Sequence, residues 1–165
     1  APSDTNISKN WTPRTSTTTT ISGYNSDTGK SYNPGDKYYE GTGSEHYHVG
    51  NYYQWSAATA GYTGTSQSTQ SICPKGWTLP SQSQFQQLIN SGLSSSNATN
   101  APYYLLRGGF LGYSSLLDAG SGGYYWSSTP DGSSYAYFLG FGSGNASTNY
   151  NARYIGFSVR CVAAG

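Results

Sequence analysis

Few side chains in this 165-residue sequence can perform covalent chemistry. It contains two cysteines, two histidines and seven acidic residues. Asp118 and Asp131 are the only acids after Glu45, so the sequence does not indicate the converging pair of carboxylates that a glycosidase needs. Ser127 and Ser128 belong to no G-x-S-x-G motif, and no catalytic triad spacing is present. We therefore predict that the protein is not an enzyme.

Candidate metal ligands are sparse. His46 and His48 would share one side of an extended strand, because side chains alternate along a strand. Such a pair permits metal binding, but a polar strand face is the more common reason for this spacing. Calcium needs several oxygen ligands, usually with carboxylates. Asp118, Asp131 and loop carbonyls could together bind calcium, but the sequence does not predict such a site. We expect no cofactor.

The two cysteines, Cys73 and Cys161, are predicted to form a disulfide. In a chain poor in Lys and rich in Tyr, Thr and Asn, bridged cysteines are more common than free ones. Two unrelated buried thiols are the alternative. Closing so long a loop stabilises a fold by roughly 4–5 kcal/mol in the chain-entropy model.

The composition favours binding over catalysis. Charged residues make up 9% of the chain and aromatic residues 16%, with 17 Tyr and 22 Gly. Surfaces rich in Tyr, Ser, Gly and Asn are typical of binding sites, although a β-rich fold with many turns has a similar composition. The formal net charge of +1, without a run of Lys or Arg, argues against nucleic-acid binding.

The sequence predicts a chain that acts outside the cell. No apolar stretch approaches the ~20 residues of a membrane span. The chain has no Met and begins with Ala1-Pro2-Ser3, as expected for a mature chain after signal removal or for a trimmed one. Residues 1–22 form a Thr-rich arm, either an edge strand or an extended linker, and residues 23–165 are predicted to form a single domain.

Two helices are predicted. Residues 50–60 have the spacing of a short amphipathic helix, with Gly61 as its stop. A clearer helix begins at Ser81, which forms a capping-box pattern with Gln84, and Gly92 ends it. Its apolar face is predicted to comprise Phe85, Leu88 and Ile89.

The pattern turns to short strands after residue 103. The predicted strands are 124–128, 135–141 and 153–162. A long polar loop is predicted over 142–151, and loops of this length often carry function. The residues expected to cover the core are Trp77, Leu79 and Trp126.

Three segments, in order, carry a resemblance to a known family. They are CPKGWTLPSQSQFQQL at 73–88, GYYWSST at 123–129, and YAYFLGF followed by RYIGFSVRCV between 135 and 162. Together they resemble the Fibrobacter succinogenes major paralogous domain family. VGNYYQWSAATAG at 49–61 resembles the versions in Saccharibacteria surface proteins. The resemblance covers roughly residues 49–163.

The resemblance implies a fold and a mode of action. The family is similar, at greater distance, to the formylglycine-generating-enzyme branch of the C-type lectin-like fold. That implies an α+β class with two helices on a small, twisted, mostly antiparallel sheet, long loops and one disulfide. The cysteines match the bridging positions of the family rather than a catalytic pair, so a formylglycine-generating activity is not expected.

The expected function is an extracellular or cell-surface ligand-binding domain, like an adhesin or receptor. Its partner would be a protein or a glycan on another cell, and its binding face would be built from loops at 107–117 and 129–154. Tyr and Asn side chains there can stack on and hydrogen-bond to a ligand, although some of these Tyr can instead be core-packing strand positions. The candidate contacts are Tyr113, Asp131, Ser133, Tyr135, Tyr137, Asn145, Asn149, Tyr150, Asn151 and Tyr154.

Two other interpretations stay open. The residue types of 131–154 match those that diversity-generating retroelements introduce into C-type lectin-like domains, although ordinary turns have the same residues. Alternatively, the chain is a structural subunit of a surface fibre or pilus, with the Thr-rich arm exchanged between subunits. The protein would accordingly be a monomer or associated with a fibre.

Overall fold

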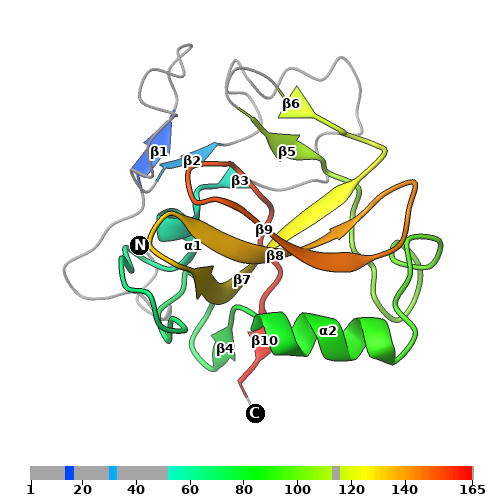
Figure 1. Ribbon diagram of the computed structural model, residues 1–165, viewed down its shortest axis with the longest axis horizontal. Coiled ribbons are helices and arrows are strands. Elements are labelled where there is room, and N and C mark those ends of the chain that lie inside the picture. Colours follow the sequence, from blue (N-terminus) through cyan, green and yellow to red (C-terminus); the bar gives the residue numbers. More distant parts are fainter. Residues whose placement is uncertain (1–13, 17–29, 33–51, 113–115, 165) are drawn as a thin grey trace.

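The computed structural model describes residues 14–16, 30–32, 52–112 and 116–164, which form a small α+β fold (Figure 1). The α+β class agrees with the prediction. The described part contains helices α1 (Trp55–Ala58) and α2 (Gln82–Asn90). Its strands are β1 (Arg14–Ser16), β2 (Lys30–Tyr32), β3 (Tyr52–Tyr53), β4 (Trp77–Thr78), β5 (Phe110–Leu111), β6 (Leu116–Leu117), β7 (Gly123–Asp131), β8 (Tyr135–Phe141), β9 (Ser147–Ala152) and β10 (Val162–Ala163).

An antiparallel sheet of β7, β8 and β9 crosses the centre of the molecule (Figure 1). The predicted strands at 124–128 and 135–141 are confirmed, and β7 extends further, to Asp131. Its register shifts before Pro130, where the Ser127 hydroxyl accepts the N–H of Thr129 and donates to the Tyr137 carbonyl. Proline lacks an N–H and is therefore tolerated at such an irregularity.

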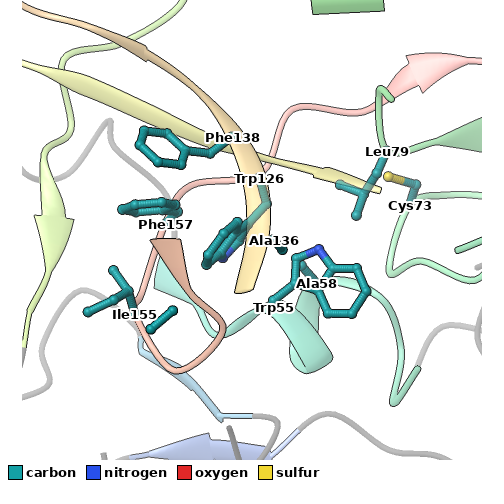
Figure 2. Close-up of a cluster of buried hydrophobic side chains, with 10 residues drawn as sticks. Trp55, Ala58, Cys73, Leu79, Trp126, Ala136, Phe138, Ile155 and Phe157 are labelled. Atoms are coloured by element: carbon teal, nitrogen blue, oxygen red, sulfur yellow. The ribbon is translucent and has the colours of Figure 1, made fainter. Parts of the chain in front are cut away.

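The sheet separates two apolar clusters, because successive residues of β7 point to opposite faces. Trp126 is fully buried on one face, where its ring centroid lies 4.4 Å from that of Phe157, and Phe138 lies 4.6 Å from Phe157 (Figure 2). Tyr125 is buried on the other face in a cluster with Phe85 of α2. Both faces of the sheet are therefore covered where these residues lie.

Helix α2 begins as the sequence predicts. The Ser81 hydroxyl accepts the N–H of Gln84 at 3.1 Å, and the Gln84 side chain accepts the N–H of Ser81 at 2.8 Å. Gly92 has a φ of +117°, which suits a helix end. Phe85 is buried, but Leu88 is 37% exposed, so the predicted apolar face is too wide. Phe85 is therefore the residue of the predicted face that packs fully against the sheet, and Ile89 is partly buried beside it.

The helix predicted over 50–60 is shorter than expected. Helix α1 has four residues, and residues 52–53 form strand β3 instead. Trp55 is fully buried, and its indole N–H donates to the Ser127 carbonyl at 2.8 Å. Gly61 follows with a φ of +86°, in agreement with its predicted role as a stop. Tertiary contacts of Trp55 thus fix a helix too short to form alone.

Arg153 is buried and joins segments that are distant in sequence. Its guanidinium lies 4.3 Å from the centroid of the Trp55 ring. It donates to the carbonyls of Gly64 at 3.0 Å, Gly132 at 2.6 Å and Tyr135 at 3.2 Å. The Arg153 carbonyl accepts the N–H of Trp55 at 2.8 Å. One side chain thereby fixes a loop, the β7–β8 turn, the start of β8 and α1.

The disulfide between Cys73 and Cys161 is confirmed, with 5.8 Å between the Cα atoms and a sequence separation of 88. It joins the segment before β4 to the segment before β10. These two strands pair antiparallel. The bridge and the short β4–β10 pair therefore close the same junction.

Trp77 does not cover the core as predicted. It is 45% exposed, whereas Leu79 and Trp126 are buried as expected. Strand β4 ends at Thr78, so the alternation of a strand does not carry from Trp77 to Leu79.

Two predictions for the C-terminal part are wrong. The expected polar loop at 142–151 contains most of β9, and the expected strand at 153–162 contributes only Val162 to a strand, β10. Strand β9 lies at a sheet edge, and its side chains are mostly polar, so no apolar alternation marks it. The buried segment after β9 makes single bridges with three different parts of the chain, Tyr53↔Phe157, Leu111↔Gly156 and Tyr125↔Ser158.

Several predictions lie outside the described residues. These concern His46, His48, Tyr113 and most of the arm at 1–22. Within the arm, β1 pairs in parallel with β2, which pairs antiparallel with β3.

Replacing Arg153 by Met should lower the free energy of unfolding by about 2–4 kcal/mol, because the bonds from a buried guanidinium to three carbonyls are lost. Urea unfolding followed by circular dichroism measures this. Arg160→Met is the matched control. The Arg160 guanidinium is exposed and donates to the Tyr104 carbonyl at 3.4 Å, so its loss should cost less than about 0.5 kcal/mol. Equal losses in the two variants would contradict this role of Arg153.

Replacing both Cys73 and Cys161 by Ser should lower the free energy of unfolding by roughly 4–5 kcal/mol, because the 88-residue separation makes the unfolded chain much freer. The same denaturant titration measures it, with the wild type under reducing conditions as a second comparison. A change below about 1 kcal/mol would show that the β4–β10 pair and the core hold the junction without the bridge.

Candidate functional site

The predicted site residues, apart from Tyr113, lie on or next to the β7–β8–β9 sheet. Strands supply most of them, rather than the loops that the sequence suggested. The sheet divides them between its two faces, because residues that pair across strands share a face and neighbours along a strand do not.

Three tyrosines gather on one face, and we name Tyr135, Tyr137 and Tyr150 the tyrosine cluster. Tyr137 pairs directly with Tyr150 across β8 and β9. The Tyr150 ring lies 5.9 Å from that of Tyr135 and 6.1 Å from that of Tyr137, in both cases at 79°. Tyr135 is 46% exposed and Tyr150 is 54% exposed. The predicted alternation that places Tyr135 and Tyr137 on one face is therefore confirmed, and part of that face is exposed.

Strand pairing and hydrogen bonds hold the residues beside the tyrosine cluster. Tyr135 pairs with Asp131 at the end of β7, and its carbonyl accepts from Arg153. On the other side, the Thr148 hydroxyl lies 3.4 Å from the side-chain oxygen of Gln86 on α2. Ser133 is exposed in the turn next to the cluster. Asp131 and Ser133 can therefore contact the same partner as the tyrosines.

The asparagines of β9 lie on the opposite face. Asn149 pairs with Phe138, and Asn151 pairs with Ala136, so both share the face of the Trp126 cluster. Asn149 accepts the N–H of Tyr150 through its side-chain oxygen at 2.8 Å. This bond leaves the amide NH₂ of Asn149 to act as a donor. The two asparagines cannot contact the same small ligand as the tyrosine cluster.

Tyr154 and Asn145 occupy two further positions. Tyr154 is half-buried against the Trp126 cluster, and its carbonyl accepts from the Gln54 side chain at 3.1 Å. This arrangement makes Tyr154 a packing residue. Asn145 is exposed in the β8–β9 turn, at the rim of a cleft.

The cleft has a volume of about 520 Å³ and lies over the end of the sheet, on the same face as Asn149. It is open on one side, between the 118–122 loop and the β8–β9 turn. Besides Asn145 and Asn149, the residues that determine its chemistry are Arg107, Asp118 and Tyr124. This site was not predicted from the sequence. Gly140, near the end of β8, was the available signal, because a strand glycine often marks a close approach to the backbone.

Asp118 and Tyr124 form a hydrogen-bonded pair in the cleft. The Tyr124 hydroxyl donates to the Asp118 carboxylate at 2.6 Å. Burial, together with this bond, raises the pKa of Tyr124 to about 12. Burial also raises the pKa of Tyr125 to about 12, and its hydroxyl donates to the Leu106 carbonyl at 2.9 Å. Both phenols are therefore protonated donors throughout the physiological pH range.

The described residues supply hydrogen-bonding and aromatic side chains at this site. They contain no cluster of three or more His, Cys, Asp or Glu residues that could hold a metal ion. Over the same part of the chain, every helix is too short or too polar to cross a bilayer. The groups present can hold a ligand by hydrogen bonds and aromatic contacts.

Comparisons with protein-family models, with curated proteins and with solved structures give no match for this chain.

The stability of the fold should fall as the pH rises from about 10 to about 12. Tyr124 and Tyr125 bind their protons more tightly in the folded state, so their contribution is complete below pH 10 and is lost as pH rises through the folded pKa. Absorbance at alkaline pH follows ionisation, and urea unfolding at each pH follows stability. Tyr124→Phe with Tyr125→Phe should flatten the decline, whereas an unchanged decline would assign it to other groups.

Proposed function

We propose that this chain is a ligand-binding domain that acts outside the cell or on its surface, with the tyrosine cluster as its main contact surface. One observation carries the proposal. The Tyr150 ring contacts the rings of Tyr135 and Tyr137 edge to face on a paired sheet, and Tyr135 and Tyr150 are about half exposed. The exposed parts of these two rings are available to a partner.

The tyrosine cluster suits binding for a physical reason. Each tyrosine presents a broad apolar ring and a hydroxyl that can donate and accept. A tyrosine has few rotatable bonds, so little side-chain entropy is lost when a partner binds. The backbone beneath it is fixed by the β8–β9 ladder and by the Arg153 bond to the Tyr135 carbonyl. The surface is therefore largely preorganised, which favours affinity.

The proposed fold family is the C-type lectin-like fold, as the family resemblance implies. The α+β class, the small antiparallel sheets and the Cys73–Cys161 bridge support this assignment. The bridge also supports an extracellular location, because disulfides persist mainly in oxidising compartments.

The proposed partner is a protein or glycan on another cell. Asp131 is the single charged side chain among the predicted contact residues on the described sheet. Recognition would therefore depend on aromatic contact and hydrogen bonding rather than on charge, and it should vary little with salt concentration.

The test compares the Tyr135→Ala/Tyr150→Ala double variant with wild type in binding to glycan arrays and to panels of whole cells. The double variant should bind at least tenfold more weakly, because both exposed rings are lost. Tyr104→Ala is the control, since Tyr104 is 60% exposed but lies outside the cluster. Equal binding by the double variant and wild type would overturn the proposal for this surface.

A further inference from the structure

The cleft on the face opposite the tyrosine cluster lies between strand residues of the sheet, the 118–122 loop and the β8–β9 turn. Its floor is Gly140, which pairs with Tyr124 on one side and Ser147 on the other. A Cβ added to Gly140 would lie 3.0 Å from the Phe138 ring and 3.8 Å from the Tyr124 ring. Any larger side chain would therefore fill the floor, and glycine keeps it open.

Arg107 fixes the rims of the cleft. Its guanidinium donates to the Ser121 carbonyl at 2.6 Å, to the Ser95 carbonyl at 2.5 Å and to the Gly142 carbonyl at 3.5 Å. It also lies 5.4 Å from the centroid of the Phe141 ring. The 118–122 loop and the β8–β9 turn are thereby held to one charged group, so the cleft does not depend on a ligand for its shape.

The polar groups of the cleft have complementary roles. The Asp118 carboxylate accepts one bond from Tyr124 and has further lone pairs to accept from a ligand. The amides of Asn149 and Asn145 can donate. The charges of Asp118 and Arg107 balance, and Arg107 is already engaged with carbonyls. Acceptors and donors thus lie on opposite sides of a glycine floor.

We propose that this cleft binds a neutral polyhydroxylated ligand of the size of a mono- or disaccharide. Neighbouring hydroxyls on a sugar ring donate to a carboxylate and accept from an amide, which matches Asp118 and Asn149. The C–H face of the ring packs on the glycine floor and on the edges of Tyr124 and Phe138. The volume of about 520 Å³ lies in the range of roughly 300–1,000 Å³ that small-ligand sites have.

Charged ligands fit the cleft less well. An anion would meet the Asp118 carboxylate, while the Arg107 N–H groups that could attract it already bind carbonyls. A cation would find one carboxylate, whose charge is balanced by the Arg107 guanidinium in the same cleft. A neutral ligand uses every group without leaving a charge unpaired. The site shares no residue with the tyrosine cluster, so the two proposals stand or fall separately.

The experiment titrates the isotope-labelled full chain with glucose, galactose, mannose, N-acetylglucosamine and their common disaccharides. Binding is followed by chemical shifts of the backbone amides. We expect at least one sugar to shift Gly140, Gly142 and Gly144 while leaving Tyr135 and Tyr150 in place. Asp118→Asn and Asn149→Ala should each weaken that sugar at least tenfold. Asn tolerates the φ of +57° at position 118, so the first variant keeps the fold.

The controls separate the cleft from the rest of the chain. Asp131→Asn makes the same chemical change on the other face, outside the cleft lining. It should leave the sugar-induced shifts of Gly140, Gly142 and Gly144 as in wild type, as should Tyr135→Ala. Sodium sulfate and methylamine serve as the anionic and cationic probes. Absence of shifts in the cleft with every sugar, shifts there with a charged probe alone, or equal sugar binding by Asp118→Asn would each overturn the proposal.

Discussion

The burial of the Arg153 guanidinium against the Trp55 ring is the constraint that fixes several separate segments of this structure. A buried charge is costly unless donors and acceptors are arranged around it. Here three carbonyls accept from it, those of Gly64, Gly132 and Tyr135. Because they belong to separate segments, satisfying the charge also fixes the loop after α1, the β7–β8 turn and the start of β8. The support beneath the tyrosine cluster is one consequence.

The central sheet presents two different surfaces, one on each face. Near Tyr125 and Trp126 both faces are covered by apolar clusters, so the middle of the sheet is rigid. Toward the two ends of the β8–β9 hairpin, the apolar clusters no longer cover the sheet. The tyrosine cluster emerges on one side and the glycine-floored cleft on the other. Neither surface relies on a long flexible loop, so both exist before a partner arrives.

Local chemistry made part of the molecule predictable. The capping box at Ser81 and the stop at Gly92 depend on neighbouring residues alone, and both are found where expected. The shared face of Tyr135 and Tyr137 follows from strand periodicity. Strand β9 was not predicted because an exposed edge strand can be polar throughout, so it lacks the alternation of apolar and polar residues that marks other strands. Trp77 was misassigned because whether a strand continues past Thr78 depends on its partner β10.

The sequence by itself determined the start of α2, the small number of reactive groups and the expectation of a disulfide, since each follows from composition or from neighbouring residues. The α+β class was an expectation from the family resemblance. Only the tertiary structure decided which side chains meet. It placed Tyr150 beside Tyr137, put Asn149 on the opposite face, and brought Asp118 to Tyr124 above Gly140. The reason is register: strand pairing joins residues across the hairpin, and a shift of one residue would move every side chain to the other face.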